Sequence, residues 1–118
     1  MINRYCVIQY MPDLSGEAIN IAVFCFGEDG ARFASTEQWD RVACFAQRDI
    51  AFLRDFVREM DEKCAEGKLN AQMVEVMVSK WHGSFHVVAP RASTQNLDTL
   101  FRSARMMYLG HMEEVCNG

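Results

Sequence analysis

The sequence lacks any run of about 18 apolar residues, the length that a membrane-spanning helix requires, so we expect no membrane span. It also lacks an excess of positive charge, because 12 Lys and Arg stand against 16 Asp and Glu and leave a net charge of −4. Sequence-independent nucleic-acid binding needs a basic face that displaces counterions, so this balance argues against a nucleic-acid partner. The first residues include Asn3, Arg4 and Gln9 and no small-residue cleavage site, so no signal peptide is expected.

Disulfide signatures are missing as well. The five cysteines are odd in number and no two of them have Cys-x-x-Cys spacing. Two of them, Cys6 and Cys25, lie in apolar segments, where a thiol acts as a small hydrophobic group. Half of the residues are hydrophobic, so the chain can build a core without disulfides. We therefore predict reduced thiols and a cytoplasmic location.

Motifs that carry catalysis or metal binding are also absent. The sequence contains no phosphate-binding loop, nucleophile elbow or paired-histidine zinc signature. His82 and His86 have the spacing of a helical metal pair, but Gly83 and a change to strand separate them. No cysteine is paired with a histidine by spacing, and a reactive cysteine needs a polar setting. We therefore expect no metal and no cofactor, and we favour a protein that is not an enzyme while leaving an enzyme open.

What the sequence does contain is a pair of apolar strands at its start, predicted at 4–11 and 18–26 and joined by a polar turn. Nearly every residue in both strands can be buried. The polar residues that stand out in these strands or directly beside them are Gln9, Glu17 and Asn20. A buried polar group without a hydrogen-bond partner costs roughly 1–3 kcal/mol. These three residues are therefore the first place to look for a site.

The rest of the chain is predicted to add one strand, three helices, another strand and a helix. The expected bounds are a strand at 31–35, helices at 39–46 and 49–66, a helix favoured over a strand at 69–81, a strand at 84–89 ended by Pro90, and a helix that Gly110 closes. The order β-β-β-α-α-α-β-α predicts an α+β domain over 1–110, with a loose tail at 111–118. Its sheet should be small and mainly antiparallel, with about four strands and with helices mostly on one face. Strands this apolar also predict partial cover on the second face, from a helix or from a partner chain.

The ends of the helices have recognisable capping residues. Thr36 and Asp49 are predicted N-caps, and Ser93 or Thr94 is the predicted cap of the last helix. Gly67 is the predicted stop of the second helix.

The polar residues of the first two strands have two interpretations. If the second strand alternates regularly, Asn20 shares a face with Ala18 and Ala22. In one interpretation, Glu17 and Asn20 bind backbone groups of the turn and fix the hairpin. In the other, they form a polar floor for a ligand or a partner side chain. Arg91, at the end of a strand, has the same two interpretations. It either pairs with Glu17, which is a structural role, or reaches a bound acid, because a guanidinium suits a planar acceptor.

Arginine dominates the basic residues, with nine Arg among the twelve. Arg102 and Arg105 lie on the polar side of the last predicted helix, and Arg41 and Arg48 lie elsewhere. An arginine bias favours an interface over simple solubility. Nucleic acid would become a candidate partner only if these four side chains shared one face.

Several short motifs resemble a bacterial family of small proteins classed as a domain of unknown function. They are Tyr5 to Tyr10, Pro12-Asp13, Gly16-Glu17, Asn20 to Val23, Phe85 to Arg91, and Leu97 to Phe101. The chain has Ala22 where that family commonly has glycine and His86 where it has a polar amide-type residue. The family has no established activity. Some members are encoded near kinase-like toxin homologues or in phage and mobile-element contexts, so the resemblance favours partner binding.

These observations predict a non-enzymatic cytoplasmic protein-binding module in a phage, defence or toxin setting. Its partner would be another protein or a second copy of the chain. The alternative is a small ligand-binding domain or enzyme with a polar pocket around Glu17, Asn20 and Arg91. Arg102 and Arg105 complete the candidate binding residues.

Overall fold

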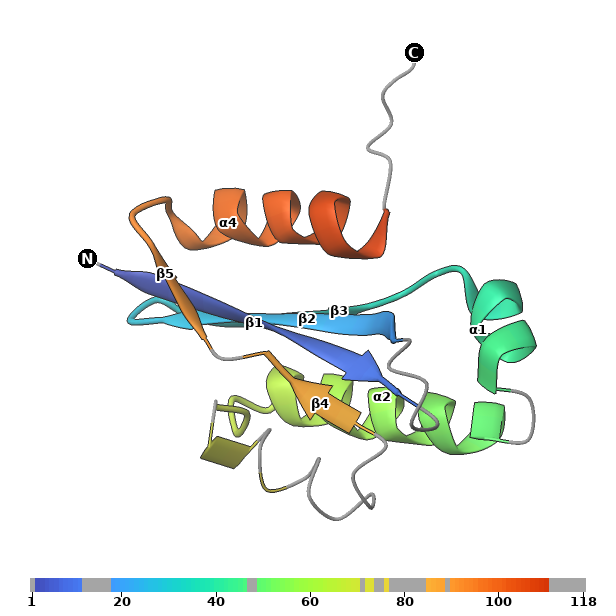
Figure 1. The fold of residues 1–118 in the computed structure, drawn as a ribbon. Coiled ribbons are helices and arrows are strands. Elements are labelled where there is room, and N and C mark those ends of the chain that lie inside the picture. The colour runs from blue at the N-terminus through green and yellow to red at the C-terminus, as the bar shows by residue number, and fades with distance from the viewer. Residues whose placement is uncertain are drawn as a thin grey trace.

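Five strands form one sheet, and helices lie on both of its faces (Figure 1). The elements, in chain order, are β1 (Asn3–Tyr10), β2 (Ile19–Gly27), β3 (Gly30–Ser35), α1 (Trp39–Ala46), α2 (Ile50–Ala65), β4 (Phe85–Val87), β5 (Arg91–Ser93), α4 (Leu97–Ala104) and the π-helical turn η2 (Arg105–Leu109). Every strand pair in the described part of the chain is antiparallel. The predicted α+β class and mainly antiparallel sheet are therefore confirmed.

This computed structural model describes residues 2–11, 18–46, 49–70, 72–73, 76, 85–88 and 90–110. Some features predicted from the sequence lie outside these residues. They are the turn that contains Glu17, Arg48, most of the segment 69–81, His82 with Gly83, and the tail at 111–118.

The sheet has the strand order β3-β2-β1-β4, and β5 also pairs with β1. β4 pairs with residues 8–10 of β1, and β5 pairs with residues 3–5 of the same strand. The sequence predicted that the chain leaves the sheet at Pro90. In the structure it does not, because β5 follows directly and pairs with β1. Proline lacks a donor and interrupts the ladder there, but the next three residues resume pairing with β1, which adds a strand to the expected four.

One face of the sheet packs on α1 and α2. The large buried side chains of this core include Ile8, Tyr10 and Phe24 from the sheet and Phe56 and Met60 from α2, all at most 2% exposed. Fully burying an apolar side chain of this size contributes about 1.5–3 kcal/mol. This face therefore carries most of the core.

The opposite face packs on α4 and η2, as Figure 1 shows. Val7, Val23 and Cys25 of the sheet lie against Leu97 and Leu100 in a second buried cluster. The predicted cover on the second face thus comes from a helix of the same chain. No helix in the described part of the chain is long and apolar enough to cross a membrane.

The helix ends only partly match their predicted caps. The N–H of Gln38 donates to Thr36 Oγ1 at 3.0 Å, which forms a turn just ahead of α1. Asp49 makes no side-chain cap. Its Oδ2 instead accepts a hydrogen bond from the Tyr10 hydroxyl, with the two oxygens 2.5 Å apart. The cap of α4 is Asn96, whose Oδ1 accepts from the N–H of Thr99 at 2.8 Å.

The predicted caps Ser93 and Thr94 are wrong, because Ser93 belongs to β5 and the helix starts later. The two predicted glycine stops lie at helix ends with positive φ, 74° at Gly67 and 69° at Gly110.

Candidate functional site

A β-bulge in β2 decides where Asn20 lies. Ile8 pairs with Ala22, but Gln9 pairs with Asn20, so Ile21 is an extra residue on the β2 side. The Ile21 carbonyl accepts the N–H of Thr36 at 2.7 Å, which holds the bulge. A bulge re-aims the side chains that follow it. Ala22 therefore packs in the α2-side core, whereas Asn20 faces η2. The prediction that Asn20 shares a face with Ala22 is wrong for this reason.

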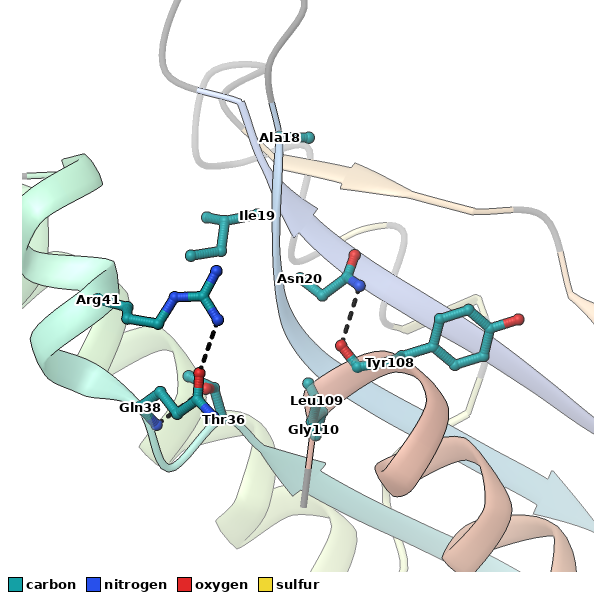
Figure 2. Close-up of a pocket in the computed structure, with 9 residues that line it drawn as sticks. All are labelled: Ala18, Ile19, Asn20, Thr36, Gln38, Arg41, Tyr108, Leu109 and Gly110. Carbon is teal, nitrogen blue, oxygen red and sulfur yellow. Dashed lines mark hydrogen bonds between the residues drawn. The ribbon is translucent and has the colours of Figure 1, made fainter. Parts of the chain in front are cut away.

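Two side-chain amides form a chain of hydrogen bonds that ends on η2. Gln9 Nε2 donates to Asn20 Oδ1 at 2.9 Å. Asn20 Nδ2 donates to the carbonyl of Tyr108 at 2.9 Å, the bond that Figure 2 shows between the two residues. A backbone carbonyl can only accept, so Asn20 must turn its NH₂ group to Tyr108 and its oxygen to Gln9. The direction of both amides is thereby fixed. Asn20 ties the sheet to η2.

The Tyr108 carbonyl is available because it lies at the end of a helix. The last carbonyls of a helix have no partner within it and are satisfied by other groups. Gly110 closes η2 in the left-handed region, and its N–H donates to the Arg105 carbonyl. Asn20 supplies a further donor from the neighbouring strand.

A pair of tyrosines stands beside the amides. The hydroxyls of Tyr5 and Tyr108 are 3.3 Å apart, and the ring centroids are 5.9 Å apart. The hydrogen bond to Tyr5 is the main reason that the pKa of Tyr108 lies above its ordinary value of 10.0, while Arg91 acts in the opposite direction. The hydroxyl of Tyr108 is therefore protonated at neutral pH.

Arg91 approaches the same place from β5. Its backbone is paired with that of Tyr5, so the two side chains are cross-strand neighbours. The residue is exposed. Within the described residues, the Arg91 guanidinium has no hydrogen bond and no ion pair, and the predicted partner Glu17 is outside them. The five N–H donors of this group remain available to an acceptor.

These groups line one cavity of about 220 Å³ between β1, β5 and η2. Its wall combines two amides, two phenol hydroxyls and one guanidinium with a few apolar groups. The lining residues are Tyr5, Cys6, Val7, Gln9, Asn20, Val88, Arg91 and Tyr108. We refer to it as the Arg91 cavity. The structure therefore brings together two of the predicted site residues, Asn20 and Arg91.

A second hollow of about 250 Å³ lies on the other side of Asn20 and Tyr108 (Figure 2). Its cation is Arg41, whose Nη1 donates to Gln38 Oε1 at 2.9 Å. This guanidinium already has an acceptor. The second hollow therefore offers fewer unused N–H donors to an anion than the Arg91 cavity does.

The remaining predicted cations lie elsewhere. Arg102 is exposed on α4 and does not line the Arg91 cavity. Arg105 packs over the ring of Phe101, 4.9 Å from its centroid, and lines a separate hollow beside α2. Arg41 lines the hollow described above, so Arg41 and Arg105 share no cavity wall.

The tyrosines are the part of the site that the sequence did not identify. Tyr5 and Tyr108 are 103 residues apart, and no spacing links them. Alternation along β1 offers one signal, since Tyr5, Val7 and Gln9 occupy alternate positions and line the same cavity.

Cys6 lines the Arg91 cavity, and His86 of β4 pairs with Gln9 of β1. Burial, and then the neighbouring Cys6, raise the pKa of the Cys25 thiol to about 12, so it stays protonated at neutral pH. His86 is exposed on β4. Within the described ranges, no three His, Cys, Asp or Glu side chains come close enough together to share a metal ion.

Comparison with known protein families gives a match over most of the chain. The sequence model of a family described as a protein of unknown function (DUF3037) matches residues 5–102. No curated protein and no solved structure matches the chain. The resemblance to a family of unknown function is confirmed by this match, which covers most of β1 and reaches into α4.

Proposed function

The chain belongs to this family of proteins of unknown function, and we propose that it is a ligand-binding domain that holds a small anion in the Arg91 cavity. One observation carries the proposal. The Arg91 guanidinium, without a hydrogen bond or ion pair from any described residue, lines the same cavity as the amides of Gln9 and Asn20. A cavity with a few convergent polar groups is the usual form of a small-molecule site.

The donors in the cavity outnumber the acceptors that use them. Arg91 has five N–H donors, and a tyrosine pair that shares one hydrogen bond has a second hydroxyl proton to give. The two hydrogen bonds of the Asn20 amide fix its orientation. Asn20 therefore holds the cavity wall in place, and Arg91 makes the main contact with the ligand. A site that is rich in donors and positively charged selects an anionic acceptor.

The groups on the wall bind rather than transfer protons. A general base works best with a pKa near the working pH. The pKa of Tyr108 is raised further from neutrality, and a guanidinium stays charged. We therefore propose binding without catalysis for this cavity.

Calorimetric titration with sodium acetate tests the proposal. We expect saturable binding that Arg91→Gln abolishes and that Arg102→Gln leaves unchanged, since Arg102 is exposed outside the cavity. Equal affinity in both variants would show that the anion is held elsewhere.

A second candidate is the protein-binding module predicted from the sequence. Met106 and Met107 are 48% and 71% exposed on η2, and exposed methionines suit adaptable interfaces. If the partner is a second copy, sedimentation should show a dimer that Met106→Glu dissociates. A monomer at all concentrations would reject a self-copy.

A cytoplasmic location is part of the proposal. It is supported by Cys6, Cys25, Cys44 and Cys64, which are free thiols. A phage, defence or toxin setting stays a prediction.

A further inference from the structure

We infer that the anion held by Arg91 is the carboxylate of a small molecule whose apolar part lies in a neighbouring hollow between α4 and β5. This inference rests on the function proposed above and specifies its ligand.

The neighbouring hollow has a volume of about 210 Å³. It shares Tyr5 and Tyr108 with the Arg91 cavity, so the tyrosine pair is a common wall of both. The two hollows lie next to each other along the gap between the sheet and the last helix. A ligand that reaches past the tyrosine pair can therefore occupy both.

The two hollows differ in chemistry. The one beside α4 includes the apolar Leu100, Ala104 and Met107 in its wall. The polar Ser93, Gln95 and Ser103 also line it. Leu100 and Ala104 are each 3% exposed, whereas Met107 is 71% exposed. Buried aliphatic groups thus lie on the inner side and a flexible thioether side chain lies at the entrance. An apolar group placed there would remove Met107 from water.

The other neighbour of the Arg91 cavity has the opposite character. It includes Thr36, Gln38 and Arg41, which are polar. An apolar substituent is therefore directed toward α4 and away from Arg41. This gives a bound molecule one orientation, with its charged end on Arg91.

A carboxylate fits Arg91 better than a dianion does. A guanidinium forms two parallel hydrogen bonds with one planar carboxylate. Arg91 is the one cation among the residues that line the cavity in the described part of the chain. A single negative charge is balanced by it, whereas a phosphate dianion would be left half-neutralised.

Binding constants for acetate, butanoate and hexanoate test this inference. Each buried CH₂ group can increase affinity up to about fourfold, so we expect hexanoate to bind at least tenfold more tightly than acetate. Hexanol should bind at least tenfold more weakly than hexanoate, because it lacks the charge. Inorganic phosphate that binds as tightly as hexanoate would overturn the inference.

Two variants separate this inference from the proposed function. Ser103→Leu fills the apolar hollow from the partly exposed side of α4, and it should remove the dependence on chain length while leaving acetate binding unchanged. Arg91→Gln should remove the binding of every carboxylate. If acetate binds at Arg91 but chain length has no effect, the inference fails and the proposed function stands. If no carboxylate binding depends on Arg91, both fail.

A peptide C-terminus offers the same chemistry as a free acid. A hexapeptide that ends in leucine with a free carboxylate distinguishes the two sources. We expect it to bind no more tightly than hexanoate. A peptide that binds tenfold more tightly than hexanoate would overturn the assignment to a small molecule.

Discussion

Asn20 of β2 and Tyr108 of η2 are 88 residues apart in sequence, and the side-chain amide of the first donates to the backbone carbonyl of the second at 2.9 Å. This bond fastens the last helical turn to the sheet beside the Arg91 cavity. The same amide accepts from Gln9, so one side chain connects β1, β2 and η2. The position of the tyrosine wall therefore depends on a residue from the first hairpin.

Replacing Asn20 should destabilise the protein. Asn20→Ala leaves Gln9 Nε2 and the Tyr108 carbonyl without their partner, at a cost of about 1–3 kcal/mol in the free energy of unfolding. Urea denaturation measures this change. Gln38→Ala is the matched control, since its side chain bonds only at the exposed surface and should change stability by less than about 0.5 kcal/mol. Equal effects would contradict the bridging role.

A side chain at Gly27 should collide with the side chain of Asn3. A Cβ at this position would lie 1.8 Å from Oδ1 of Asn3, which is 1% exposed. Gly27→Ala should therefore destabilise the protein by about 1–3 kcal/mol in thermal or urea unfolding.

A double-mutant cycle tests the cause of that loss. Asn3→Ser shortens the side chain that the new methyl group meets. The double variant should lose less stability than the sum of the two single variants. If the stability losses of the two single variants simply add, the contact with Asn3 is not the reason that Gly27→Ala destabilises the protein.

The pKa of Tyr108 should respond in opposite directions to its two neighbours. The Tyr5 hydrogen bond raises this pKa, so Tyr5→Phe should lower it toward 10.0. Arg91 lowers it, so Arg91→Gln should raise it further. Ultraviolet titration of tyrosine ionisation measures both shifts. Shifts in the same direction would contradict the arrangement.

The same pKa predicts how stability depends on alkaline pH. Because the pKa of Tyr108 is higher in the folded protein than in the unfolded chain, its contribution is present below the ordinary value of 10.0. That contribution is lost as the pH rises through the folded pKa. In Tyr5→Phe this alkaline loss should shrink, as urea unfolding across that pH range would reveal.

Replacing either of two phenylalanines on α2 with alanine should reduce the free energy of unfolding by very different amounts. Phe56 is 0% exposed and its ring stacks on Phe85 with centroids 4.4 Å apart, so Phe56→Ala should cost about 3–5 kcal/mol. Phe52 is 49% exposed, and Phe52→Ala should cost far less. Chemical denaturation compares the two. Similar losses would place the core of this face elsewhere.

The sequence predicted the parts of the fold that local pattern controls. The helix at 39–46 and the strands that became β1, β2 and β3 were placed from apolar spacing and turn residues, with bounds that agree within one residue. The bulge at Ile21 was not predictable, because its carbonyl is held by Thr36 from another strand end. β5 was missed because Arg91–Ser93 has no strand pattern and pairs only through contact with β1.

Part of the candidate site was also predictable from local sequence pattern. Asn20 and Arg91 were found because polar residues in or beside apolar strands are unusual, and the structure places both on one cavity wall. Arg102 and Arg105 are predicted from a helix face alone. In the structure Arg102 is exposed outside the Arg91 cavity, and Arg105 lines a separate hollow. Tyr108 reached the site through a π-helical turn that no spacing rule indicated.

Nuclear magnetic resonance of the side-chain N–H groups during a hexanoate titration measures directly whether the Arg91 cavity binds a carboxylate. The Arg91 Nε–H signal and the Gln9 and Asn20 amide signals should shift together to saturation, and the Arg102 signal should stay in place. In Arg91→Gln the amide signals should not move. If hexanoate leaves the Arg91 signal unchanged while the protein is folded, the assignment of this cavity as an anion site is wrong.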